Sequence, residues 1–164
     1  MISANIIKLL NEQIAEEMYA ANLYLSMSSW CFMKGYDGAG EFLFAHADEE
    51  LGHAKKLITY LNETDCKVEI AAISKPDCEF GSLAEVFEKT YAHEQKITSL
   101  INNLVDSTLQ SKDYGTFNFL QWYVNEQHEE EALFRGIVDK IKILGSNGEA
   151  LYLADRAIKE LVGK

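Results

Sequence analysis

The sequence has very few residues that break helices. Its 164 residues include one proline, Pro76, and ten glycines. Proline interrupts helices and sheet ladders because it lacks a backbone N–H group, so its scarcity leaves long segments free to form uninterrupted helices. Most of the sequence also lacks the alternation of apolar and polar residues that is typical of half-buried strands. Together these absences predict an all-α fold.

Other absences narrow the class of protein. No apolar run approaches the roughly 20 residues that a membrane span requires, and residues 1–5 lack the basic and then apolar pattern of a secretory signal. Cys31, Cys66 and Cys78 show neither C-x-x-C nor zinc-ribbon spacing, which favours free thiols in a reducing cytoplasm. The formal net charge of −11 argues against nucleic-acid or membrane partners. It suits attraction of cations, although solubility explains an acidic chain equally well.

Apolar residues recur at helical spacing in four long segments and one short segment. The expected helices span approximately residues 5–33, 37–62, 82–110, 113–144 and 148–162. The periodicity lapses between residues 63 and 81, a segment long enough to cross a bundle in extended form. Two short connections and one long crossover predict a single domain, residues 1–164, built as a four-helix bundle. The short fifth helix should pack across the bundle's end or against a neighbouring subunit.

The second expected helix carries an E-x-x-H motif on its apolar face. Glu50 and His53 lie one helical turn apart, so their side chains point the same way. A carboxylate on an apolar face is costly unless it is neutralised, paired or bound to a metal ion. A glutamate oxygen and an imidazole nitrogen at this spacing can bind one metal ion. An isolated motif of this kind more often forms a Glu–His hydrogen bond at a helix surface, so the other helices must support the metal site.

Each of the four long helices places a glutamate within its core-facing stripe. These glutamates are Glu17, Glu50, Glu94 and Glu130, with Glu131 as an alternative to Glu130. Ionised carboxylates cannot remain unpaired together in one core, because desolvation and mutual repulsion would force them neutral. Two divalent cations bridged by shared carboxylates satisfy them, as in known di-metal helical bundles. The alternative is that a stripe is shifted by one residue, so that one of these glutamates faces solvent.

Four motifs, one in each long helix, carry a resemblance to a known family. They are Asn11-Glu12-Gln13 ahead of Glu17, Glu49-Glu50-x-x-His53, Tyr91-x-x-Glu94-Gln95, and TFNFLQWYVNEQHEEE at 116–131. With these motifs the chain resembles the bacterial non-haem ferritins over its whole length. The resemblance implies a ferritin-like four-helix bundle and a hollow shell of 24 identical subunits. It also implies ferroxidase activity, in which Fe(II) is oxidised by O2 or H2O2 and stored as a ferric oxyhydroxide mineral.

The resemblance also implies which residues bind iron. The ligands of a first iron are matched by Glu17, Glu50 and His53. The ligands of a second iron are matched by the bridging Glu50, Glu94 and Glu130, with Gln127 nearby. A third iron site is matched by Glu49, Glu126 and Glu129, with Glu130. Tyr24 matches a tyrosine that can be oxidised during turnover.

Alternatives stay open for several of these residues. Tyr24 can equally be a core tyrosine whose hydroxyl binds a buried carboxylate. The glutamates matched to the third site can equally form a solvated acidic patch. Three histidines have no partner at ligand spacing on their own helix faces and are left unassigned: His46, His93 and His128.

Departures from the motifs of related families argue against other ferritin-like functions. By the same resemblance, bacterioferritins bind haem through a methionine one residue before the histidine of E-x-x-H; this chain has Gly52 there, so no haem is expected. Rubrerythrins carry a second E-x-x-H where this chain has Gln127-x-x-Glu130, which argues against a rubrerythrin-like di-iron peroxidase. The acidic charge opposes a DNA-coating mini-ferritin. A metal-free helical scaffold is the alternative from a different class.

Iron entry should not depend on an acidic three-fold pore. By the resemblance, animal ferritins line that pore with two carboxylates near the start of the fourth helix, where this chain has Asn118 and Gln121. These neutral side chains provide no Coulomb attraction for a cation. The double substitution Asn118→Ala with Gln121→Ala should leave the initial rate of Fe(II) oxidation nearly unchanged in stopped-flow absorbance measurements. A large loss of rate in an intact shell would contradict this prediction.

Overall fold

The computed structural model describes residues 2–163 and contains five α-helices. Their bounds are Ala4–Met33 for α1, Asp37–Glu63 for α2, Leu83–Gln110 for α3, Tyr114–Leu144 for α4 and Gly148–Lys159 for α5. Residues 2–163 contain no β-strand, which confirms the predicted all-α class. Among these residues, no helix is both long enough and apolar enough to cross a membrane. The last helix is shorter than expected, because turns rather than helix occupy residues 160–163.

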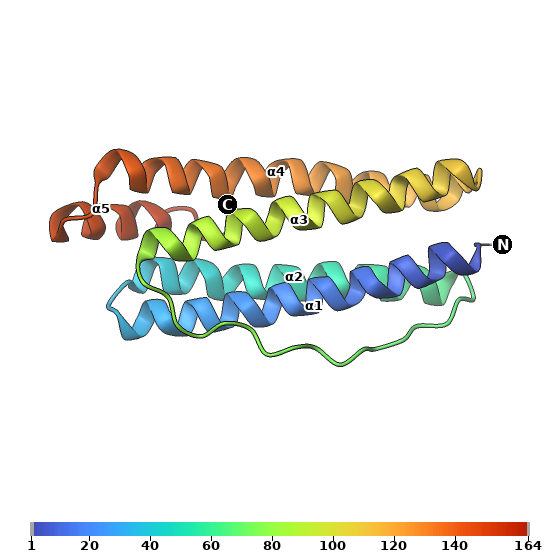
Figure 1. Cartoon of the computed structure of the whole chain (residues 1–164), viewed down its shortest axis with the longest axis horizontal. Helices are drawn as coiled ribbons and strands as arrows, with labels where there is room; N and C mark the ends of the chain where they lie inside the picture. The colour runs from blue at the N-terminus through green and yellow to red at the C-terminus, as the bar shows by residue number, and fades with distance from the viewer. Residues whose placement is uncertain (1, 164) are drawn as a thin grey trace.

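Two antiparallel helix pairs form the bundle (Figure 1). α1 packs mainly against α2, α3 packs mainly against α4, and α1 also contacts α3. The segment 64–82 connects α2 to α3 and runs in extended form along the outside of α1 (Figure 1). α5 follows the end of α4 and packs against α2 and α4. This arrangement confirms the predicted bundle with one long crossover and a short fifth helix.

Polar side chains cap the starts of most helices, as helix termini require for their unpaired N–H groups. In each of four caps, a side-chain oxygen accepts a hydrogen bond from the backbone N–H three residues later. The N–H of Ile6 donates to Ser3 at 3.3 Å, and that of Glu85 to Ser82 at 3.1 Å. The N–H of Thr116 donates to Asp113 at 3.1 Å, and that of Ala150 to Asn147 at 2.9 Å. These caps place the starts of α1, α3, α4 and α5.

α2 takes its cap from another helix. Tyr36, the residue before α2, makes no capping bond with its own side chain in the described part of the chain. Instead, the two carboxylate oxygens of Asp155 in α5 accept hydrogen bonds from the N–H groups of Gly38 and Ala39, at 3.0 and 2.8 Å. Gly38 permits this approach, since a Cβ atom there would collide with the Asp155 carbonyl oxygen and lie 2.9 Å from Cβ of Lys159. α5 is therefore attached to the start of α2.

A layer of polar side chains divides the apolar core near the middle of the bundle. One apolar cluster, which includes Met27, Phe42 and Phe134, fills the half nearer α5. The other cluster, which includes Leu10 and Leu57, fills the opposite half. All four long helices contribute to both clusters, and between them each helix buries one glutamate. The two apolar clusters thus hold the polar layer from both sides.

The cap from α5 should be detectable as local stability. Replacing Asp155 by Ala removes both acceptors, and the loss of such a cap typically costs about 1 kcal/mol. Backbone amide exchange at Gly38 and Ala39 should then become about five times faster in mass-spectrometric or NMR hydrogen-exchange measurements. Asp155→Asn keeps one acceptor oxygen and should show a smaller change, and the exposed Asp139→Ala should show none. Unchanged exchange in Asp155→Ala would mean that the cap contributes no stability.

Candidate metal centre

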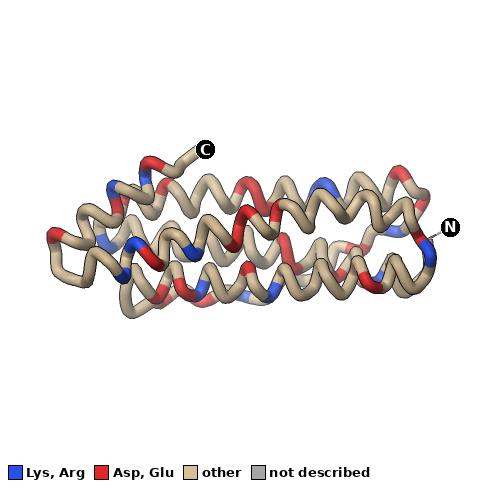
Figure 2. Tube along the Cα trace, turned by 90° about the horizontal axis from the view of Figure 1, so that it is seen from above, with Lys and Arg blue, Asp and Glu red and all other residues tan. Residues whose placement is uncertain are grey.

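The four predicted core glutamates are almost completely buried in the polar layer. Glu17, Glu50, Glu94 and Glu130 are 1, 2, 1 and 5% exposed, whereas the alternative Glu131 is only part-buried. Carboxylates are seldom buried to this degree unless they are paired, protonated or bound to a metal ion. Figure 2 shows acidic positions of neighbouring helices gathered near the middle of the bundle.

Glu17, Glu50 and His53 form a compact group of candidate ligands. One ligand atom of each lies within 4.8 Å of the others, and Nδ1 of His53 is 3.3 Å from an oxygen of Glu50. The Gln13 amide donates a 2.9 Å hydrogen bond that orients Glu17. The Tyr123 hydroxyl donates a 2.7 Å bond to the backbone carbonyl of His53 and ties α4 to α2 at this point. Two carboxylates and one imidazole suit a first-row divalent cation such as Fe(II).

Glu94 and Glu130 extend this group from α3 and α4 but are held by other partners. The Tyr24 hydroxyl donates a hydrogen bond to one oxygen of Glu94, and the Gln127 amide donates to the other at 3.0 Å. An oxygen of Glu130 lies 3.4 Å from Nε2 of His46. The residues matched to the second iron therefore border the first group without converging on one point, as Glu17, Glu50 and His53 do.

Burial makes these carboxyl groups weak acids. Desolvation, followed by the charge of Glu50, raises the pKa of Glu17 well above its ordinary value. Desolvation and the charges of Glu94 and Glu130 likewise raise the pKa of Glu50. Desolvation raises the pKa of Glu94 to about 7, although the hydrogen bond from Tyr24 lowers it. A divalent cation can replace the retained protons and balance the carboxylate charges.

The glutamates matched to a third site line a cavity beside the buried group. The cavity has a volume of about 420 Å³ and is lined by His46, Glu49, Glu126, Glu129, Glu130, Leu133, Leu161 and Gly163. Glu49 and Glu129 are exposed, whereas Glu126 is part-buried and one of its oxygens lies 3.8 Å from Nε2 of His53. Burial raises the pKa of Glu126. Because it lines the cavity and approaches His53, Glu126 connects the cavity with the first group.

The structure corrects the interpretation of His46. Sequence spacing predicted no ligand partner on its own helix face, but Glu49, one turn later in α2, lies 3.6 Å from its Nε2 atom. With Glu130 of α4, these residues form a second group whose ligand atoms lie within 4.8 Å of one another. The resemblance assigns Glu49 to the third iron site, and its pairing with His46 was not predicted because Glu49 is exposed outside the apolar stripe. Burial disfavours the charged form of His46, but the nearby carboxylates of Glu130 and Glu49 outweigh this effect and raise the pKa of His46.

The other two unassigned histidines make different contacts. The ring of His93 is buried beside those of Tyr19 and Tyr24, with centroid distances of 5.7 and 6.2 Å. Burial lowers the pKa of His93 to about 4, so its imidazole is neutral at pH 7. His128 is exposed on α4. Neither belongs to the two groups of converging ligand atoms in residues 2–163.

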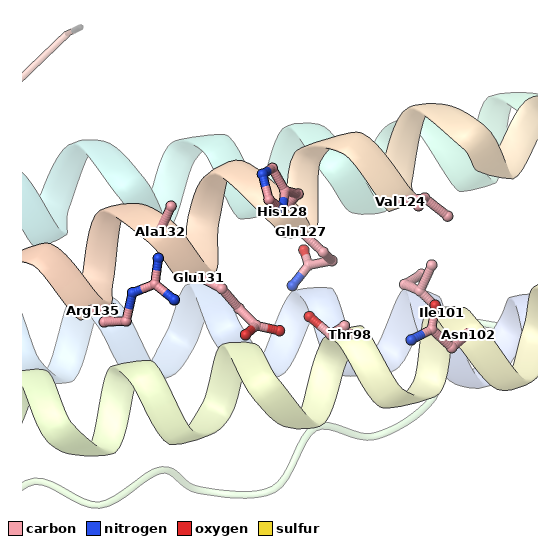
Figure 3. Close-up of a pocket in the computed structure, with 9 residues that line it drawn as sticks. All are labelled: Thr98, Ile101, Asn102, Val124, Gln127, His128, Glu131, Ala132 and Arg135. Carbon is pink, nitrogen blue, oxygen red and sulfur yellow. The ribbon is translucent and has the colours of Figure 1, made fainter.

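Gln127 also lines a separate cavity of about 300 Å³ between α3 and α4. The lining residues are Thr98, Ile101, Asn102, Val124, Gln127, His128, Glu131, Ala132 and Arg135 (Figure 3). Figure 3 shows the side chains of Gln127 and Thr98 extending toward each other from α4 and α3. The Thr98 hydroxyl has no hydrogen-bond partner among the residues described. Gln127 therefore lies between this cavity and Glu94, to which its amide donates a hydrogen bond.

The chain is similar to known proteins over nearly its whole length. Residues 7–144 match the family model for the ferritin-like domain. The chain is 68% identical over 161 residues to a bacterial non-heme ferritin of Campylobacter jejuni, covering 98% of this chain and 96% of that protein. It is 45% identical to a bacterial non-heme ferritin of Escherichia coli O157:H7, covering 98% of each. An open-pore ferritin of Archaeoglobus fulgidus has a similar crystal structure, with a TM-score of 0.95, 39% identity and coverage of 97% and 98%.

The burial of Glu94 should destabilise the iron-free protein at alkaline pH. Because its folded pKa, about 7, exceeds the unfolded value of 4.5, the unfolded chain loses this proton first and stability falls as pH rises through that window. Glu94→Gln removes the charge, and Gln127 can turn its amide to accept from the new side chain. The variant should be more stable than the parent by on the order of 2 kcal/mol at pH 8, with little difference near pH 4.5.

Thermal or denaturant unfolding of the iron-free protein measures this difference. The exposed Glu79→Gln provides the matched control, since the same chemical change at a solvated position should leave stability unchanged at both pH values. A stability gain in Glu94→Gln that is equal at both pH values would contradict the assigned cause.

Proposed function

This chain belongs to the ferritin family, and we propose that it works as an iron-storage ferritin with ferroxidase activity. Fe(II) is its substrate, O2 or H2O2 is the oxidant, and a ferric oxyhydroxide mineral is the stored product. The observation that carries the proposal is the buried group of Glu17, Glu50 and His53, bordered by Glu94 and Glu130. A metal-free scaffold would carry the desolvation cost of these carboxylates with no compensating function.

In this proposal two Fe(II) ions bind side by side. The first is bound by Glu17, Glu50 and His53, whose ligand atoms already converge. The second is bound by Glu94, Glu130 and the bridging Glu50, with the Gln127 amide nearby. Both Glu94 and Glu130 must exchange their present hydrogen-bond or ion-pair partners for the metal. The two sites are therefore unequal, because only the first has an imidazole ligand and preassembled geometry.

The carboxyl groups of the centre release protons when metal binds, and neighbouring side chains orient these ligands. Binding of a dication displaces the protons that burial retains on Glu17, Glu50 and Glu94. Oxidation of two Fe(II) ions to Fe(III) then supplies two electrons. These reduce one O2 to H2O2, or one H2O2 to two water molecules, and either reaction takes up two protons. Gln13 keeps the Glu17 carboxylate in place. In this proposal Tyr24, whose hydroxyl donates a hydrogen bond to Glu94, acts as an additional electron donor.

The acidic cavity supports onward movement of the product. Glu126 approaches His53 on one side and lines the cavity with Glu49 and Glu129 on the other. Successive carboxylates of this kind provide oxygen ligands that suit ferric and ferrous ions and exchange readily at an exposed surface. In the proposal, oxidised iron leaves the second site along these residues toward the mineral, and the centre accepts new Fe(II).

The exposed apolar side chains support assembly into a larger particle. Large apolar residues with high exposure include Met33, Tyr114, Ile143 and Tyr152, at 82, 66, 83 and 61%. Such residues occur on more than one helix, as a subunit with several interfaces requires. We propose a closed shell of 24 copies, in the cytoplasm, where the free thiols of Cys31, Cys66 and Cys78 stay reduced.

Substitutions of single ligands should affect the two proposed iron sites differently. His53→Ala should reduce the initial rate of Fe(II) oxidation about a hundredfold or more, since even partners behind a metal ligand are commonly worth 10–100-fold. Glu130→Ala should weaken the second site while the first still fills. At the oxidation centre, anaerobic calorimetric titration with Fe(II) should show two unequal sites in the parent, one site in Glu130→Ala and no tight site in His53→Ala.

The exposed His128→Ala is the matched control and should retain both sites and the parent rate. Each variant is compared only after sedimentation shows an intact particle. The proposal fails if the parent neither binds nor oxidises Fe(II), or if its two sites are equal in affinity.

A further inference from the structure

His46 is a buried histidine to which the proposed reaction gives no role. It is 6% exposed on α2 and its ring packs against those of Phe42 and Phe134, with centroid distances of 4.3 and 5.2 Å. These apolar contacts hold the imidazole ring in position, with its Nε2 atom directed toward carboxylates. Nε2 lies 3.4 Å from an oxygen of Glu130 and 3.6 Å from an oxygen of Glu49.

The facing atoms of His46 and Glu130 lack ordinary partners. Within residues 2–163, neither Nε2 of His46 nor the adjacent Oε2 of Glu130 takes part in a hydrogen bond, although both atoms are inaccessible to solvent. Buried polar atoms without partners are rare, and such a pair calls for an explanation such as a bound ion. Two donors that each lie about 2.1 Å from one metal ion are about 3.0–3.4 Å apart at octahedral or tetrahedral angles. The observed 3.4 Å separation of these atoms fits that spacing.

We propose that His46, Glu49 and Glu130 form a second metal-binding site with an imidazole ligand. The site takes first-row divalent ions that accept nitrogen ligands, such as Fe(II) or Zn(II), in preference to Mg²⁺ or Ca²⁺. It differs from the all-carboxylate third site that family resemblance implies, because Glu126 is turned toward His53 and His46 takes part instead. One side opens to the acidic cavity of about 420 Å³.

Glu130 gives this site its connection to the oxidation centre. The charge of Glu130 raises the pKa of Glu50 and of Glu94, while its carboxylate faces His46. A change in the direction of this one side chain moves a ligand from the second iron position to the His46 site. Iron leaving the centre can therefore be received by His46 and Glu49 while it is still bound to Glu130. This transfer role rests on the proposed function, whereas ion binding at the site does not.

Zn(II) titration of the iron-free particle tests the site without any redox step. The parent should bind Zn(II) at the Glu17–Glu50–His53 group and at the His46 site. His46→Phe removes the nitrogen ligand but keeps an aromatic ring between Phe42 and Phe134, and it should remove one binding event or weaken it at least about tenfold. Glu49→Gln changes an exposed residue with little risk to folding and should have the same effect. His128→Phe, on the exposed face of α4, should bind Zn(II) as the parent does.

Anomalous diffraction from a Zn(II)-soaked crystal locates the ion directly. A peak within bonding distance of Nε2 of His46, absent in His46→Phe, supports the proposal. Unchanged Zn(II) binding in both His46→Phe and Glu49→Gln overturns it and leaves a metal-free ion pair between His46 and Glu130. In His53→Ala, binding that persists at His46 separates this site from the oxidation centre, so failure of one proposal can be told from failure of the other.

Discussion

The desolvation of carboxylates in a closed helical core is the constraint on which the structure depends. Each long helix places one glutamate in the same layer, and burial raises the pKa of Glu17, Glu50 and Glu94 above its ordinary range. Such a layer opposes folding unless protons or cations neutralise it. The two apolar clusters on either side provide the packing that keeps it in place. A single buried group thus sets both the instability of the iron-free core and its affinity for cations.

The carboxylates in this layer differ in how firmly they are held. Glu17 is oriented by Gln13, and both oxygens of Glu94 are occupied by Tyr24 and Gln127. Glu130 has only the poorly aligned contact with His46. Ligands fixed by hydrogen bonds favour a preassembled site, whereas a ligand without such bonds can change direction at little cost. The asymmetry of the centre therefore comes from the neighbours of the ligands as much as from the ligand types.

Helical periodicity was sufficient to predict the bundle and its core glutamates. A spacing of 3.6 residues assigns Glu17, Glu50 and Glu94 to buried faces without knowledge of how the helices pack. The position of His46 could not be predicted in the same way, because Glu130 is on a different helix and contacts between helices depend on their relative rotation. The cap that Asp155 gives to α2 was missed for the same reason. Helical periodicity predicts which face of a single helix is buried. Contacts between two helices also depend on their relative rotation and axial position, which periodicity does not give.

The extended crossover outside α1 divides the ligands of the candidate metal centre between two helical hairpins. On one side of it, the α1–α2 hairpin holds Glu17, Glu50 and His53 together with His46 and Glu49. On the other, the α3–α4 hairpin holds Glu94, Gln127 and Glu130. Each hairpin carries one half of the candidate metal centre, and the crossover is the direct chain connection between the two hairpins. An ion bound by carboxylates of both hairpins would hold the two halves of the subunit together, so that iron loading and the stability of the fold reinforce each other.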